Sequence, residues 1–144
     1  MQTYTSTFVV KGEDLNHHGT LFGARAAAWF VEAGLIAVAK EHGKLDEIVM
    51  RNILDMSFRK PVENGTMLEF QARVVYAGNT SLVAGIVAKN AYTGERYIEG
   101  YITYVTVEFG MGGKKPHGIL LDETSDEEEL AQRAQAENLL RGRK

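Results

Sequence analysis

The sequence predicts an α+β domain in which one long helix is wrapped by a curved antiparallel sheet. The first observation is the apolar segment 21–43, which is rich in alanine, contains no proline and ends at Gly43 with basic residues in its last turn. The second is a series of segments rich in β-branched and aromatic residues, separated by short polar turns. A helix that is apolar nearly all round needs burial on most sides, and a curved sheet provides that burial.

Five strands are expected from the second pattern. Short polar connections, such as Ala77-Gly78-Asn79-Thr80, separate neighbouring segments and are typical of hairpin turns. The expected strands are 4–10, 49–58, 67–76, 81–89 and 96–109.

The last part of the chain predicts a second helix. Ser125 and Glu128 fit a capping box, with Ser125 as the N-cap, and the helix should extend to about Arg141. We expect this helix, or another subunit, to cover the outer side of the sheet. The expected organisation is a single domain over residues 1–110, followed by a loop and a helical tail over residues 111–144.

Composition excludes several classes of function. The chain has a net charge of −3, and the segment from Asp122 onward holds seven acidic and four basic residues, so residues 1–121 are neutral. A nucleic-acid-binding protein normally has a basic face, and we therefore expect no nucleic-acid partner. The absence of cysteine excludes disulfides, thiolate metal sites and a cysteine nucleophile.

The expected location is the cytoplasm. The first residues lack the basic start and apolar stretch of a signal peptide. The most apolar segment, 21–39, is interrupted by Arg25 and Glu32, and charged groups are costly in a bilayer, so we expect no membrane span.

The most specific motif is DLNHHGTLFGARAAAWFVEAG, from Asp14 to Gly34. It resembles the acyl-CoA hydrolase branch of the hotdog-fold thioesterases, whose signature is D-x-N-x-x-G-x-x-F-G-G followed by a helix with W-x-D-E-A. Later elements are similar to this family as well: SFRKPV followed by NG, RVVY followed by GNTS, and the closing strand 101–108. The resemblance covers about residues 5–109 and implies the hotdog fold.

The resemblance also implies an activity and a site. The activity is hydrolysis of acyl-CoA to free acid and CoA, in a homo-oligomer of at least two chains, with no cofactor besides the CoA of the substrate. Asn16 matches the family's catalytic asparagine, and the backbone N–H groups of Gly23 and Ala24 would stabilise the oxyanion at a helix N-terminus. His18, Thr80 and Ser81 are expected to line the substrate site.

The catalytic acid is the one element that departs from the family. Counting from Gly23, the family's aspartate falls on Val31, and Glu32 occupies the next position. One step along a helix is a rotation of about 100°, so Glu32 should point in a different direction. Glu32 is either the catalytic base or nucleophile, or a carboxylate in an ion pair at a subunit interface.

Other interpretations stay open. Asn16, Thr80 and Ser81 also fit local roles in turns, and the adjacent His17 and His18 are a poor arrangement for a metal, so no metal site is expected. Because Val31 replaces the acid, the chain is alternatively an acyl-CoA-binding sensor or carrier. A hotdog dehydratase acting on acyl carrier protein is a weaker third interpretation, since such enzymes resemble a histidine-plus-acid pattern with nearby prolines.

Overall fold

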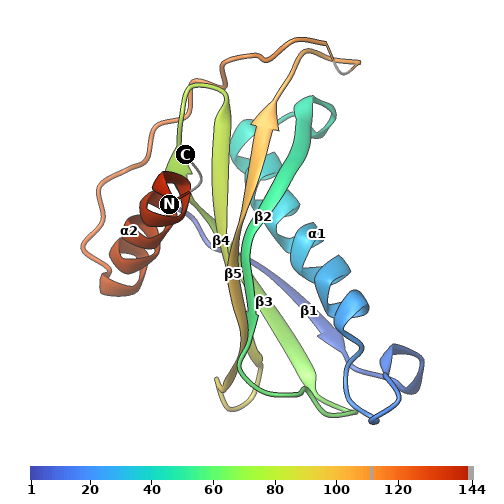
Figure 1. Cartoon of the computed structure of the whole chain (residues 1–144). Helices are drawn as coiled ribbons and strands as arrows, with labels where there is room; N and C mark the ends of the chain where they lie inside the picture. Colours follow the sequence, from blue (N-terminus) through green and yellow to red (C-terminus); the bar gives the residue numbers. More distant parts are fainter. Residues whose placement is uncertain (111, 143–144) are drawn as a thin grey trace.

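The computed structural model describes residues 1–110 and 112–142 and has three layers (Figure 1). Five antiparallel strands form one sheet in the order β1-β3-β4-β5-β2. Helix α1 (Gly23–His42) crosses one face of the sheet and α2 (Glu127–Arg141) lies on the other. The strands are β1 (Tyr4–Val9), β2 (Ile48–Phe58), β3 (Met67–Ala77), β4 (Ser81–Asn90) and β5 (Arg96–Thr106).

This architecture confirms the prediction of a curved antiparallel sheet with one long helix and a C-terminal helix. All five expected strands form, with ends that differ by a few residues. The largest difference is the end of β5, which was expected at residue 109. Beyond Thr106 the chain enters a loop closed by a hydrogen bond from the Glu108 N–H to the Gly113 carbonyl.

Burial along the strands reflects the two helices. On β3, Leu68, Phe70 and Ala72 are buried and alternate with half-exposed residues. On β4, every residue from 82 to 88 is buried, because α1 covers one face of this strand and α2 covers the other. A strand buried on both faces has a continuous apolar sequence, as β4 has.

Close packing fixes α1 on the sheet at its middle. The Tyr104 hydroxyl donates a hydrogen bond of 2.7 Å to the Val31 carbonyl oxygen in α1. Gly34 makes this approach possible, because a Cβ at that position would lie 2.7 Å from the Tyr104 oxygen and 3.0 Å from Ile86 Cδ1. The burial of Tyr104 raises the pKa of its hydroxyl.

One side of α1 is exposed, although the sequence predicted burial on most sides. Ala24, Ala28 and Glu32 are all exposed and follow a spacing of four residues, which places them on one face of the helix. The sheet curves along α1 without closing around it (Figure 1). The predicted C-terminal stop is confirmed, because Gly43 has φ 87° and its N–H bonds to the Ala39 carbonyl.

Helix α2 ends at Arg141 as predicted, but the predicted capping box is wrong. The helix begins at Glu127 with Asp126 as its N-cap, and no side chain caps it. Acidic side chains at this end of the helix pair with the sheet: the carboxylate of the N-cap Asp126 pairs with Arg73, and the Glu128 carboxylate pairs with Arg96. None of the described helices is long and apolar enough to cross a membrane.

Candidate active site

The loop before α1 is fixed by a buried carboxylate. Asp14 is 5% exposed, accepts a hydrogen bond of 2.9 Å from the Lys11 N–H and lies 3.2 Å from Arg25 Nε in the first turn of α1. Its carbonyl also accepts the Phe22 N–H at 2.8 Å. Asp14 therefore ties the loop to the start of α1, a positioning role that sequence reasoning did not assign.

The Asn16 side chain shapes the same loop. Its Oδ1 accepts the backbone N–H groups of His18 (2.9 Å) and Thr20 (3.1 Å). Its Nδ2 donates to Thr20 Oγ1 (3.1 Å) and, over a longer distance of 3.4 Å, to the Leu21 carbonyl. The turn contains Gly19 at φ 79°, a conformation that favours glycine. The local role left open by the sequence is thus present, and the long Nδ2 bond is the contact most easily exchanged for a ligand.

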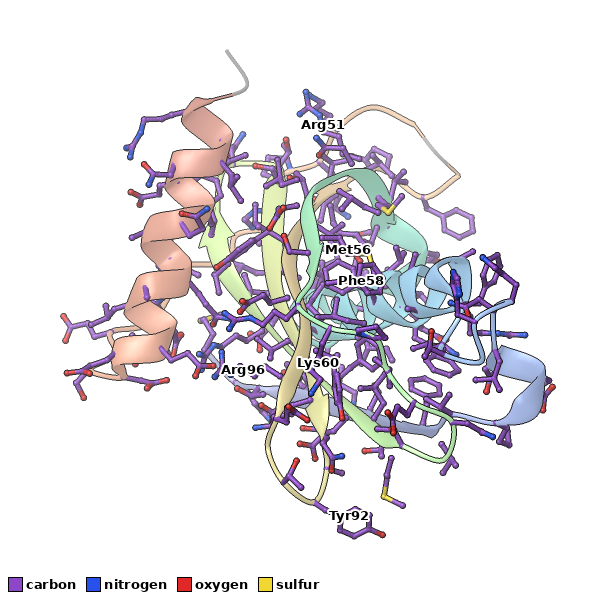
Figure 2. All side chains as sticks on the ribbon, turned by 60° about the horizontal axis from the view of Figure 1, so that its bottom comes forward. Arg51, Met56, Phe58, Lys60, Tyr92 and Arg96 are labelled. Atoms are coloured by element: carbon purple, nitrogen blue, oxygen red, sulfur yellow. The ribbon has the colours of Figure 1, made fainter. Side chains whose placement is uncertain are left out.

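A cavity of about 450 Å³ lies where α1 begins. It brings together three of the predicted site residues, Asn16, His18 and Gly23, with the segment that leaves β2, on which Figure 2 labels Phe58 and Lys60. Its remaining lining residues are Thr20, Leu21, Arg59 and Pro61. In the sequence, the SFRKPV element, residues 57–62, contains the residues that form this second side of the cavity.

The N-terminus of α1 is open toward a ligand. Its N-cap residue, Phe22, provides no side-chain hydrogen bond, and a Cβ added at Gly23 would meet nothing within 4 Å. The first-turn N–H groups of a helix have no partner within the helix and carry the positive end of its dipole. Gly23 and the exposed Ala24 therefore offer backbone donors suited to a developing oxyanion.

The basic side chains at the cavity are held in exposed ion pairs. Arg59 Nε lies 2.6 Å from Glu99 Oε1, and Lys60 Nζ lies 2.7 Å from Glu95 Oε2. The hydrogen bond to Glu95 raises the pKa of Lys60. Both pairs are exposed and screened by solvent, so either basic side chain can exchange its carboxylate for another anion at little cost.

The predicted acid lies outside this cavity. Glu32 is exposed and makes no hydrogen bond or ion pair with any residue that the structure describes. It is nine residues beyond Gly23, or about 14 Å along the helix. Val31, at the position of the family's aspartate, is half-buried against the apolar core. A single chain therefore does not bring Glu32 to Asn16.

The turn between β3 and β4 lies at the other end of the sheet (Figure 1), and Thr80 and Ser81 belong to this turn and to the start of β4. The Thr80 carbonyl accepts the Thr106 N–H at 2.8 Å, at the end of β5. Val107, which follows Thr106, donates its N–H to the Glu47 carbonyl, just before β2 begins. The turn is therefore near the start of β2. Asn16, in contrast, lies beside the segment where β2 ends. Within the described residues, no group of three or more His, Cys, Asp or Glu side chains is arranged to hold a metal ion.

These features define a protein of the hotdog-fold thioesterase class. Residues 18–95 match the model of the thioesterase superfamily, more than half of the chain, and the chain belongs to this superfamily. Comparison with curated protein sequences gives no significant match.

Solved structures of thioesterases are similar over 81–98% of this chain. An acyl-CoA hydrolase from Staphylococcus aureus, solved with butyryl-CoA, CoA and CoA disulfide, is 24% identical, with a TM-score of 0.84 over 98% of this chain and 83% of that one. A hexameric acyl-CoA thioesterase in its apo form is 28% identical, with a TM-score of 0.82 over 98% and 90%. A hexameric thioesterase from Yersinia pestis is 22% identical, with a TM-score of 0.69 over 81% and 94%.

Proposed function

We propose that this chain hydrolyses acyl-CoA thioesters to free acid and CoA, as a homo-oligomer in the cytoplasm. The observation that carries the proposal is the cavity at the uncapped start of α1, where Asn16, His18 and Gly23 meet. Backbone donors, an amide and nearby basic side chains are the groups that a thioester carbonyl and the phosphates of CoA require. The S. aureus neighbour, which binds butyryl-CoA, supports the same substrate class.

We further propose that each site is shared between two chains. Strand β2 is an edge of the sheet, and its exposed Met50, Ile53 and Phe58 suit contact with a second copy. When two β2 edges pair antiparallel about a two-fold axis, the end of one β2 meets the start of the other. The Thr80–Ser81 end of one chain then approaches the Asn16 end of its partner, and the hexameric neighbours support self-association.

The reaction needs three contributions from this site. The Gly23 and Ala24 N–H groups stabilise the oxyanion that forms when water attacks the thioester carbon. Asn16 orients the carbonyl or the attacking water. Glu32 accepts the proton of that water, and the tetrahedral intermediate then expels the CoA thiolate. The exposed carboxylate of Glu32 has no partner among the described residues of its own chain, so it is available to the cavity of a partner chain.

A second candidate function is acyl-CoA binding without turnover, as a sensor or carrier. It is favoured by the half-buried Val31. Solved mutants of the S. aureus hydrolase replace an asparagine and an aspartate that lie fifteen positions apart. Asn16 and Val31 have the same separation, which supports Val31 as the counterpart of that aspartate.

Thiol release from a panel of acyl-CoAs, beside calorimetric binding of the same panel, separates the two functions. Turnover of any member supports the thioesterase, and tight binding without thiol release supports the sensor or carrier. Chains of increasing length in the panel also report the acyl specificity.

Substitution of the two helix residues tests the role of the acid. Glu32→Gln should lower kcat by about 10²–10⁴-fold while substrate still binds, since a general base is removed and its shape is kept. Val31→Asp should raise kcat by restoring an acid at the family's helical angle. Glu137→Gln, an exposed acid on α2, serves as the matched control. A fast enzyme that is unaffected by Glu32→Gln contradicts the assignment, and weakened assembly instead identifies Glu32 as an interface residue.

A further inference from the structure

We propose that His117 is a positioning residue for substrate binding, because it clamps the β3–β4 turn that carries Thr80 and Ser81. This inference rests on the proposed function, which assigns the turn to the substrate site. His117 lies outside the part of the chain that matches the thioesterase superfamily, in the segment 114–121 between β5 and α2.

The clamp consists of hydrogen bonds to the carbonyl groups of the turn. The His117 N–H donates to the Asn79 carbonyl at 3.3 Å, and its Nε2 lies 3.0 Å from the Ser81 carbonyl oxygen. The Thr80 carbonyl between them accepts the Thr106 N–H at 2.8 Å. All three consecutive carbonyls are therefore held by residues outside the turn, two of them by His117. The Ser81 carbonyl also accepts the Gly78 N–H within the turn, at 2.9 Å.

The partners of the His117 ring determine its protonation. Nδ1 lies 2.9 Å from the backbone nitrogen of Ile119, which can only donate, so Nδ1 must be the acceptor. The Ser81 carbonyl can only accept, so Nε2 must carry the proton. A neutral ring with hydrogen on Nε2 satisfies both contacts: Nε2 donates to the Ser81 carbonyl, and Nδ1 accepts the Ile119 N–H.

Independent contacts hold the segment in place on either side of His117. Lys115 Nζ donates to the buried Glu47 carboxylate at 2.9 Å, and the Lys115 N–H donates to the Thr106 carbonyl at 2.9 Å. On the other side, Ile119 packs against the apolar core. Because these anchors are separate, replacing the His117 side chain removes its bond to the Ser81 carbonyl, while the segment and its backbone bond to Asn79 stay in place.

The two ring nitrogens allow matched substitutions. Asparagine places an oxygen near Nδ1, so His117→Asn keeps an acceptor for Ile119 and loses the bond to Ser81. Glutamine places an amide nitrogen near Nε2, so His117→Gln keeps the donor for Ser81. Leu120→Ala, at a side chain that is 86% exposed in the same segment, is the surface control.

Kinetics with butyryl-CoA and calorimetry with CoA give the functional readout, and amide exchange gives the structural one. His117→Asn should raise KM and the Kd for CoA about 3- to 10-fold, with kcat within about 2-fold, and the Gly78 and Thr106 amides should exchange about 2- to 10-fold faster, as expected for one lost hydrogen bond. His117→Gln should restore values near those of the wild type. Leu120→Ala should change none of them.

Two results would overturn the proposal in different ways. If His117→Asn leaves KM, Kd and exchange unchanged while Thr80→Val or Ser81→Ala weakens binding, the turn is part of the site but His117 does not position it. If Thr80→Val and Ser81→Ala leave binding unchanged, the turn is not part of the site, and the fault lies in the proposed function.

Discussion

The two faces of the sheet are covered by helices of opposite character. Toward α1 the sheet presents apolar side chains, and Phe30 of α1 and Phe70 of β3 are fully buried there. Toward α2 the buried residues include charged and amide side chains, among them Glu129 and Gln132. The apolar layer is held by burial, which depends little on salt, whereas the polar layer depends on specific pairs of atoms.

Arg73 of β3 is the centre of the polar layer. Its Nε donates to Gln132 Oε1 at 2.6 Å, and its guanidinium lies within 4 Å of carboxylate oxygens of Asp126 and Glu129. Arg96 extends this network to the N-terminal turn of α2 and lies on that side of the sheet in Figure 2. Arginine suits such a site because its planar fork donates to several acceptors at once.

The largest effect is expected on the apolar face. Phe30→Ala should lower the free energy of unfolding by about 3–5 kcal/mol, because it removes a buried ring and leaves a cavity. Urea denaturation measures this change, with Leu130→Ala, at a half-exposed position on α2, as the control. A loss below about 1 kcal/mol would mean that α1 is not the main source of stability.

On the polar face, Arg73→Met should cost about 1–3 kcal/mol, since it removes the donor to the buried Gln132 amide oxygen and a cation beside Glu129 while keeping much of the side-chain volume. The loss should shrink as salt is added, because salt weakens charge pairs in the wild type. Denaturation at low and high salt tests this difference from Phe30→Ala, whose effect should not shrink with salt. Equal salt dependence of the two variants would contradict the comparison.

The smallest effect concerns Glu47, at the end of the sheet where α1 ends. Hydrogen bonds from Lys115 and then His42 lower the pKa of the Glu47 carboxyl. The ionised Glu47 carboxylate therefore stabilises the fold at pH values above about 4.5, the ordinary pKa of a glutamate. This stabilisation is lost as the pH falls through the lowered pKa of the folded state.

Glu47→Gln should therefore lower Tm at pH 7, and the difference from the wild type should shrink as the pH falls from about 5 toward 3. Thermal unfolding across this pH range measures it, and Asp46→Asn, at an exposed neighbouring acid, is the control. A difference that grows with acidity would show that the carboxylate does not stabilise the fold.

The parts that sequence patterns predicted are those determined by local residues. The strands follow from β-branched segments between turns, and the stop of α1 follows from Gly43, whose left-handed conformation is local. The capping box at Ser125 failed because long-range contacts override it: Arg73 and Arg96 occupy the carboxylates of Asp126 and Glu128.

In the candidate site, too, sequence patterns predicted what depends on neighbouring residues and not what depends on long-range contacts. Asn16, His18 and Gly23 are close in sequence, and they meet in one cavity. Thr80 and Ser81 come from a hairpin whose place depends on strand order, and sequence order does not reveal that this hairpin lies at the far end of the sheet. The clamp by His117 likewise depends on a segment that no motif includes.

The separation of Asn16 from the Thr80–Ser81 turn has a genetic consequence if each site is shared between chains. Asn16→Ala would damage one half of a site, and Thr80→Val with Ser81→Ala would damage the other half. Each variant alone should be inactive as a homodimer, but a mixed dimer would contain one site with both halves intact. Two defective alleles should therefore complement each other, with about a quarter of wild-type activity expected after random reassociation of equal amounts.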